Sequence, residues 1–289
     1  MPIAEQGYVH WEGRLDVRRR PWRPIVRLGI RLAFRRKAFK FVLGMAFLPT
    51  LVFAAGVYIS ERLDDFKEMI RGADRFLKVD PEFFKAFYAS DYLLFWMLII
   101  MVLAGAGLIA DDLRHKALQL YFARPLRRRD YLQGKALTLC FFLLLLTLLP
   151  GFLFIVLKVI FSGSFKILAE YPWLPLSVAA WSLVAAGFFS FYTLALSSLS
   201  RNRRYASILL IAVYFLSDIF FGIFYGIFRD PAFTLLSVKS NLQQVAAALL
   251  GAKPFFEVPW EYSAAVLAVL AVLAGVVLSR KVRGSEVIK

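Results

Sequence analysis

Six apolar stretches, each about as long as a membrane is thick, limit what this chain can fold into. A helix needs roughly 20 predominantly apolar residues to cross the hydrocarbon core. Hydrophobic residues make up 60% of the chain and charged residues 19%, which leaves too few polar groups to coat a soluble globule. We therefore predict an all-α integral membrane protein with six transmembrane helices. The predicted spans cover about residues 39–59, 92–110, 136–160, 173–199, 207–228 and 260–278.

Positive charge is distributed unequally between the segments that flank these spans. The net charge is +16, which in a soluble protein would suggest nucleic acid. Here the charges lie between apolar runs, so we expect membrane lipids as partners and no nucleic acid. One side of the membrane collects 24 Lys and Arg residues and the other ten. The bias predicts a multi-pass protein of the plasma (inner) membrane, with both termini in the cytoplasm.

The chain divides into three parts. Residues 1–38 are expected to form a cytoplasmic tail and an amphipathic elbow helix, residues 39–279 the membrane domain, and residues 280–289 a second cytoplasmic tail. The elbow is predicted because its arginines recur every four residues on one helix face, with apolar residues between them. Such a helix suits the headgroup plane. These arginines are Arg23, Arg27, Arg31 and Arg35.

Two loops on the less basic side differ in character. Residues 61–91 are charged and mixed, and we expect a solvated external cap. The segment "LLSVKSNLQQVAAALLG" is apolar but is interrupted by Lys239, Asn241, Gln243 and Gln244. Those groups would need partners within lipid, so the segment is a poor seventh span. We predict short re-entrant or external helices between the fifth and sixth spans.

One acidic residue, Asp218, lies halfway along the predicted fifth span. An acid at the bilayer centre costs at least about 2.5 kcal/mol, so such residues usually face the bundle interior or water. Two interpretations remain open from the sequence. Asp218 could contact a substrate, a proton or a gate along a translocation path, or it could be a hydrogen-bonded structural residue.

Motifs of common enzymes do not occur in this sequence. It contains no HExxH, no GxSxG and no Walker A motif, because Ala136 follows Gly134 and Lys135 where Ser or Thr is needed. With two His and one Cys, we expect no metal cluster. We therefore predict no catalytic residue and no cofactor in this chain. Work driven by ATP would require another subunit.

The basic segment between the second and third spans carries a resemblance. "IADDLRHKALQLYFARPLRRRDYLQGK" resembles the corresponding segment of type-2 ATP-binding-cassette (ABC) transporter permeases. In that family an acidic residue stands where the chain leaves the membrane, and a small helix and a turn with Pro and basic residues follow. A Gly-Lys dipeptide then begins the third span. The elbow helix, the six spans and the polar-interrupted segment after span five are also similar to that family's plan.

The resemblance implies the permease of an exporter, which forms a homodimer and is driven by a separate ATPase subunit holding ATP and Mg. The segment between spans two and three would be the docking site, as a coupling helix. The second and fifth spans would line the path between two copies, with Asp218 as a contributor. The residues implied for docking are Asp112, Leu118, Leu120, Tyr121, Phe122, Pro125, Arg127, Arg128 and Arg129.

Two other classes of function fit parts of the sequence. A proton-coupled secondary transporter would use Asp218 and would need no soluble partner. A membrane assembly factor would keep a stable partner but would not depend on nucleotide. The substrate is not readable, because apolar and aromatic spans are explained equally well by contact with lipid.

Overall fold

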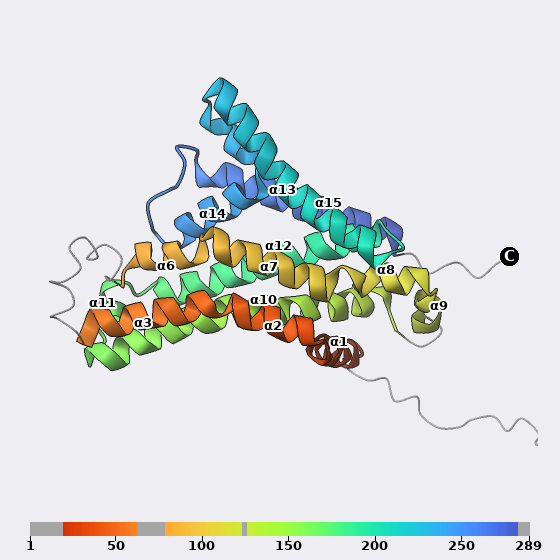
Figure 1. The fold of residues 1–289 in the computed structure, drawn as a ribbon, viewed down its shortest axis with the longest axis horizontal. Coiled ribbons are helices and arrows are strands. Elements are labelled where there is room, and N and C mark those ends of the chain that lie inside the picture. The colour runs from red at the N-terminus through yellow and green to blue at the C-terminus, as the bar shows by residue number, and fades with distance from the viewer. Residues whose placement is uncertain (1–19, 63–78, 123–125, 283–289) are drawn as a thin grey trace, which may run out of the picture.

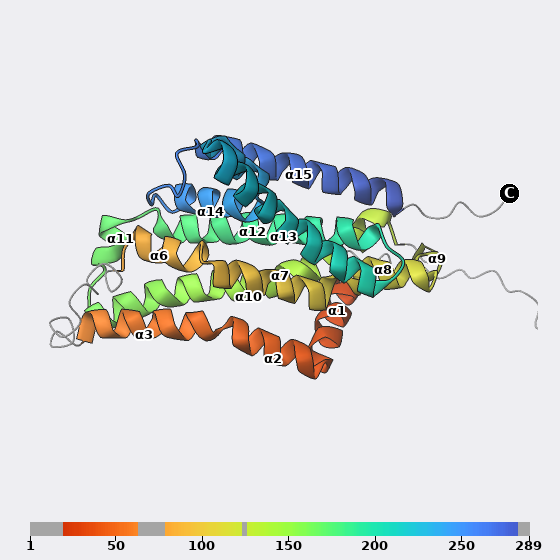
Figure 2. The same ribbon diagram turned by 45° about the horizontal axis from the view of Figure 1, so that its top comes forward.

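A computed structural model describes residues 20–62, 79–122 and 126–282 of the chain, and in these ranges every regular element is a helix. Six helical stretches are long and apolar enough to cross a membrane, as the sequence predicts. They run roughly alongside one another (Figures 1 and 2). The stretches are Lys37–Ser60, Asp91–Arg114, Arg128–Ser162, Leu174–Ser198, Arg203–Phe228 and Trp260–Lys281.

The helices are labelled as in Figure 1. In chain order they are α1 (Arg23–Arg35), α2 (Lys37–Ala46), α3 (Leu48–Arg62), α6 (Pro81–Tyr88), α7 (Asp91–Gly105), α8 (Gly107–Arg114), α9 (Ala117–Phe122), α10 (Arg128–Ser162), α11 (Lys166–Glu170), α12 (Leu174–Ser198), α13 (Arg203–Phe228), the 3₁₀ helix η1 (Pro231–Leu236), α14 (Val238–Leu249) and α15 (Trp260–Lys281).

The third span is longer than its apolar stretch. Helix α10 begins at Arg128, about two turns before the predicted start at residue 136, and continues through Pro150. Its start is capped by the carboxylate of Asp130, which accepts a hydrogen bond from the backbone N–H of Arg127 at 3.3 Å. Hydropathy marks only the part of a helix that suits lipid, so it misses the polar first turns of α10.

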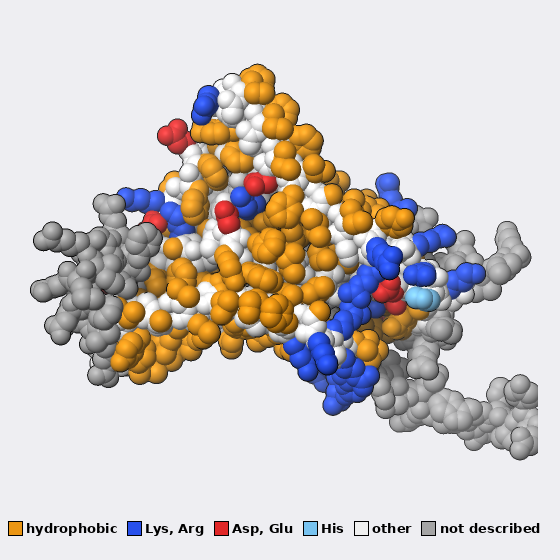
Figure 3. Space-filling model, viewed as in Figure 1, with side chains coloured by type: hydrophobic (Ala, Val, Ile, Leu, Met, Phe, Trp, Pro, Cys, Tyr) orange, Lys and Arg blue, Asp and Glu red, His pale blue; other side chains and the backbone are white. Residues whose placement is uncertain are grey.

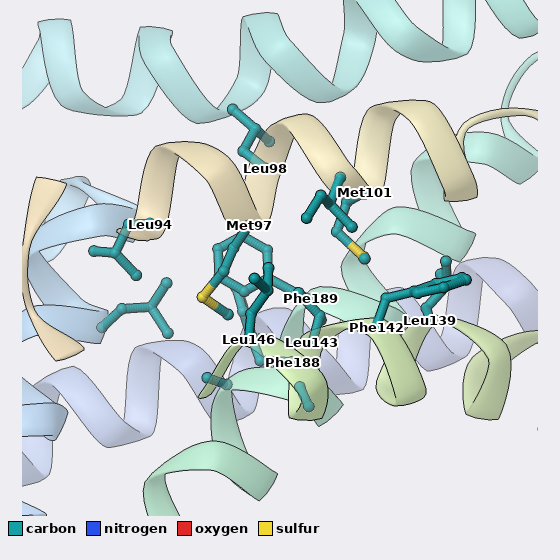
Figure 4. Close-up of a cluster of buried hydrophobic side chains, with 14 of the residues drawn as sticks. Leu94, Met97, Leu98, Met101, Leu139, Phe142, Leu143, Leu146, Phe188 and Phe189 are labelled. Atoms are coloured by element: carbon teal, nitrogen blue, oxygen red, sulfur yellow. The ribbon is translucent and has the colours of Figure 1, made fainter. Parts of the chain in front are cut away.

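Helices α7, α10 and α12 form the centre of the bundle. Their apolar side chains interdigitate, with residues of α7 facing residues of α10 and α12 (Figure 4). The buried apolar side chains are therefore concentrated in spans two, three and four. The labelled core residues are Leu94, Met97, Leu98, Met101, Leu139, Phe142, Leu143, Leu146, Phe188 and Phe189.

The fifth span lies at the periphery of the bundle. Only 11% of the most apolar window of α13 is buried, against 56% for the second span. Its outer part stands away from the other spans (Figure 1) and exposes Phe220, Ile223 and Phe228. Figure 3 shows the broad hydrophobic surface that results on this side of the molecule. A large apolar surface on a spanning helix must be covered by lipid or by another protein.

Most polar side chains between spans five and six are hydrogen-bonded inside the protein. The segment forms η1 and α14, as the sequence predicts, and nine of the 12 residues of α14 are buried. Gln244 shows how the amides are paired. Its Nε2 donates to the carbonyls of Phe256 at 3.1 Å and Val258 at 2.7 Å, and its Oε1 accepts from the N–H of Phe255 at 3.1 Å. The polar interruption therefore anchors α14 within the chain.

The solvated external cap predicted for residues 61–91 is wrong for residues 81–88. Residues 63–78 lie outside the described part of the chain. Residues 81–88 form α6, a helix packed into the bundle rather than a solvated loop. Phe84, Phe87 and Tyr88 on α6 are fully buried, and the Tyr88 hydroxyl donates to the carbonyl of Thr147 in α10 at 2.8 Å. The segment is charged overall, but burial of its aromatic residues determines where α6 packs.

Candidate coupling site

Basic side chains gather at one end of the bundle, which we call the basic end. It carries α1, α8, α9, the first turns of α10, the start of α13 and the last turn of α15. Blue side chains form a band there, against the orange surface of the spans (Figure 3). The helix α1 crosses α10 closely, because Gly134 faces Ile25 and leaves no space for a Cβ atom. The elbow predicted from arginine spacing is therefore fixed against the third span.

An ion pair joins the end of the second span to the start of the third. The Lys135 ammonium lies 2.8 Å from Oδ2 of Asp112, and the Tyr131 hydroxyl donates to the same oxygen at 2.6 Å. Lys135 is 8% exposed. A charged pair this well buried gains from additional hydrogen bonding. The acid and the Gly-Lys dipeptide of the sequence pattern thus meet in space, as parts of one contact between α8 and α10.

The small helix α9 is held against this ion pair by aromatic contacts. The rings of Tyr121 and Tyr131 lie 5.2 Å apart, and the Lys135 ammonium is 5.8 Å from the Tyr121 ring centroid. Burial and the nearby charge of Asp112 raise the pKa of the Tyr121 hydroxyl above its usual value. We call Asp112, Tyr121, Tyr131 and Lys135 the α8–α9–α10 lock.

The docking hypothesis assumed that the apolar residues of α9 face outward, but not all of them do. Leu118 is 8% exposed and belongs to the core, so it is not a surface knob for a partner. Tyr121 is half-buried in the lock. Leu120 and Phe122 lie in α9, but their side chains fall outside the described residues, as does Pro125. A six-residue helix has one side against its own protein, and Leu118 and Tyr121 lie on that side.

The three arginines after the turn have different surroundings. Arg128 donates through Nη2 to the carbonyls of Leu278, at 3.1 Å, and Ser279 at the end of α15. The carbonyl of Leu278 also accepts from the N–H of Val282 at 3.0 Å. A cation at this end adds a donor to the last carbonyls of α15 and matches the helix dipole. Arg127 and Arg129 are exposed. Arg128 thus connects the third span to the sixth, while its neighbours face the surroundings.

The outward surface of the site is polar and basic. It consists of exposed residues at the α8–α9 turn and at the start of α10. The turn is tight because Lys116 adopts a left-handed backbone conformation, with φ of 54°. The surface residues are Arg114, His115, Lys116, Arg127 and Arg129.

A break in the second span, which the sequence did not indicate, lies directly behind this site. Helix α7 ends at Gly105 and α8 begins at Gly107. The Ser197 hydroxyl from α12 donates to the carbonyl of Ala106 at 2.7 Å and accepts from the N–H groups of Ile109 and Ala110 at 3.2 and 3.1 Å. The break is therefore hydrogen-bonded by a side chain of a neighbouring span.

Asp218 lies far from the lock, towards the opposite end of the bundle. Its Oδ2 is 3.0 Å from the Lys239 ammonium, and its Oδ1 accepts from the Ser237 hydroxyl at 2.9 Å. Lys239 also lies 3.5 Å from Asp91 at the start of α7. The acid is thus an ion-paired residue that holds α14 to α13, which favours the structural interpretation. The sequence shows Lys239 among the polar residues between spans five and six, but no rule of residue spacing predicts a pair between residues 21 positions apart.

Comparison with known proteins agrees with this arrangement. The family model described as ABC-2 family transporter protein matches residues 33–280, which include the lock and all of the six spans except Lys281. No curated protein matches the chain. The chain therefore belongs to the ABC-2 transporter family and is an ABC permease.

Proposed function

We propose that this permease works as a homodimer in an exporter of the plasma (inner) membrane, driven by a separate ATPase subunit that docks on the basic end from the cytoplasm. The observation that carries the proposal is the α8–α9–α10 lock. It makes the segment between spans two and three a folded unit with buried partners, Lys135 being 8% exposed. A loop that only follows the positive-inside bias needs no such buried pair.

The lock gives the docking segment a mechanical role. Helix α9 is tied by Tyr121 and Tyr131 to α10, and Asp112 ties α8 to the same helix. A partner that pushes on α9 therefore moves the ends of spans two and three together. Two arrangements of the ATPase can then favour two arrangements of the bundle, which is what coupling requires. ATP and Mg belong to that partner, because this sequence has no Walker A motif.

The docking surface in this proposal is the outward face of the unit. Arg114, Lys116, Arg127 and Arg129 are exposed there and would meet acidic groups of the ATPase. Leu118 supports α9 from within. The path would lie between two copies, along spans two and five, and the exposed apolar surface of α13 is available for the second copy.

A pull-down with charge-reversal variants tests the docking surface. We compare the tagged chain with a variant carrying Arg114→Glu and Arg129→Glu, solubilised gently from its native membranes. Lys166→Glu is the matched control, since Lys166 is an exposed basic residue in α11 at the opposite end. We expect an ATPase to accompany the wild-type chain and the control, and to be lost with the double variant.

Two results would contradict the proposal. If the double variant retains the ATPase as fully as the control, the basic face is not where the partner docks. If no ATPase accompanies any of the three chains after crosslinking, a proton-coupled transporter becomes the better interpretation. Proton flux of Asp218→Asn vesicles would then be measured, and flux lost with that variant would support the transporter.

A further inference from the structure

Two arginine side chains from distant parts of the sequence converge on one backbone carbonyl. Arg36 donates through Nη1 to the oxygen of Leu103 at 3.1 Å, and Arg203 donates through Nη2 to the same oxygen at 2.9 Å. Arg36 directly precedes the first span and Arg203 opens the fifth. The pair therefore joins the beginnings of the first and fifth spans across the second span.

The charges at this point are not fully balanced by the part of the chain that the structure describes. Each guanidinium is permanently charged and has five N–H donors, whereas the shared carbonyl is neutral. Among the described residues, Asp111 is the acid whose charge acts on Arg203, and both side chains lie against Gly107. Two positive charges thus have one negative charge beside them. Arg36 is also exposed, which leaves most of its donors accessible.

An apolar strip of the second span leads up to the arginine pair. Tyr92, Phe95, Ile99 and Leu103 follow one another every three or four residues, so they share one face of α7. Tyr92 is 41% and Phe95 40% exposed. In both ribbon views this helix lies between α2 and α13 (Figures 1 and 2). We call these residues the α7 strip.

The two neighbouring helices, α2 and α13, also carry exposed apolar side chains near their charged ends. Phe41 stands on α2 and Ile208 on α13, each within a few residues of the arginine that precedes or opens its span. A ligand that matches the whole surface must have a compact negative group at one end and a long apolar part. That is the chemistry of an anionic lipid, and two guanidinium groups suit the oxygens of a phosphate well.

We propose that Arg36 and Arg203 bind the headgroup phosphate of an anionic phospholipid, whose acyl chains lie along the α7 strip. Coulomb attraction and hydrogen bonds from the two arginines hold the phosphate, and the α7 strip contacts the acyl chains of the lipid. A free phosphate ion would use the arginines but not the strip. The proposal goes beyond transport itself, since it assigns a site that no step of the proposed function requires.

The test measures lipid binding to the purified full-length chain in a neutral detergent. Phosphatidylglycerol, phosphatidylcholine and inorganic phosphate are titrated separately, while the unfolding temperature is followed by intrinsic fluorescence and bound lipid is counted by native mass spectrometry. We expect phosphatidylglycerol to raise the unfolding temperature and to remain bound. Phosphatidylcholine and inorganic phosphate should do neither.

Variants assign this binding to the arginine pair. Changing Arg36→Gln and Arg203→Gln together should weaken the apparent affinity for phosphatidylglycerol about tenfold, since charge-assisted hydrogen bonds are lost. Arg204→Gln is the control, because Arg204 is exposed one residue further along α13. If the double variant does not fold, the single Arg36→Gln variant carries the comparison, as Arg36 is exposed.

Three outcomes would overturn the proposal. The first is wild-type affinity for phosphatidylglycerol in the variants. The second is an equal loss in Arg204→Gln, which would indicate unspecific attraction to the basic end. The third is stabilisation by inorganic phosphate to the same extent, which would assign the arginines to a free anion.

Discussion

The Nζ atom of Lys135 lies 2.8 Å from the Oδ2 atom of Asp112, so the second and third spans are joined by a charged contact at the basic end. Lys135 is almost completely buried there, and Asp112 is the acid that balances its charge. The pair belongs to one contact with Tyr131, whose hydroxyl shares the same carboxylate oxygen. Its removal should therefore affect both the stability of the chain and the position of α9.

Asp112→Asn is expected to lower the stability of the permease by about 3 kcal/mol, because a buried ammonium loses its counter-charge. The thermal unfolding midpoint in detergent measures the loss. Adding Lys135→Met should recover much of it, since the double variant no longer buries an unpaired charge. Glu257→Gln, which removes an exposed acid, serves as the control and should leave the midpoint unchanged. Equal midpoints for Asp112→Asn and this control would refute the lock.

Gly134→Val is expected to push α1 away from α10. A Cβ at Gly134 would lie 2.8 Å from the Cβ of Ile25, and the cost of such overpacking is about 1–3 kcal/mol. Gly44→Ala is a matched substitution in α2, where nothing lies within 4 Å of an added Cβ, and it should be neutral or slightly stabilising. Unfolding midpoints and protease cleavage near Arg23 report the two effects. Similar behaviour of both variants would show that α1 does not pack on α10.

Asp218 and Lys239 are expected to be energetically coupled. Each single change, Asp218→Asn or Lys239→Met, should cost about 1 kcal/mol, because both side chains are partly exposed and their 3.0 Å pair is screened. The double variant should cost clearly less than the sum of the two, which a double-mutant cycle of unfolding midpoints measures. Additive costs would mean that the two residues do not interact, and the structural role of Asp218 would then fail.

Glu82 is expected to make stability depend on pH in the acidic range. Burial opposes ionisation, but the hydrogen bond from the N–H of Lys253, at 2.6 Å, and the ammonium of Lys85, at 2.9 Å, outweigh it and lower the pKa of the carboxyl. A lowered folded-state pKa stabilises the protein above the unfolded-state value and loses this contribution as pH falls through the folded value.

The measurement compares wild type with Glu82→Gln across that range. The wild-type chain should unfold at a higher temperature near neutral pH, and the difference should shrink as the medium becomes more acidic than the usual Glu pKa. A difference that is constant with pH would show that the contact contributes through packing alone.

The parts of this fold that follow from local pattern could be predicted from the sequence. Apolar length gave the six spans, arginine spacing gave α1, and the polar residues around Gln244 gave the short helices before span six. Each of these depends on neighbours within a few turns. The start of α10 at Arg128 could not be predicted from apolar length, because its first turns are too polar to count as membrane-spanning. The hydrogen bond that caps it, from the N–H of Arg127 to Asp130, is nevertheless local.

The contacts of the site could not be predicted, because they depend on which helix faces which. Asp112 was expected to face a partner, yet it lies against Lys135, 23 positions away in the sequence. Leu118 was expected at the surface and is buried. Periodicity assigns residues to faces of one helix, and the packing of several helices decides which face is covered. The pairing of Asp218 with Lys239 is hidden in the same way.

The interruption between Gly105 and Gly107 divides the second span into two helical segments, α7 and α8, that are joined at a break. Ser197 of the fourth span and the arginines at the ends of the first and fifth spans all hold backbone groups of this joint. A tilt of α8 relative to α7 would therefore strain bonds to three other spans at once. We expect such a joint to resist small deflections and to yield when those bonds exchange together, so under the proposed docking a force on α9 would produce a switch between discrete positions instead of a gradual bend.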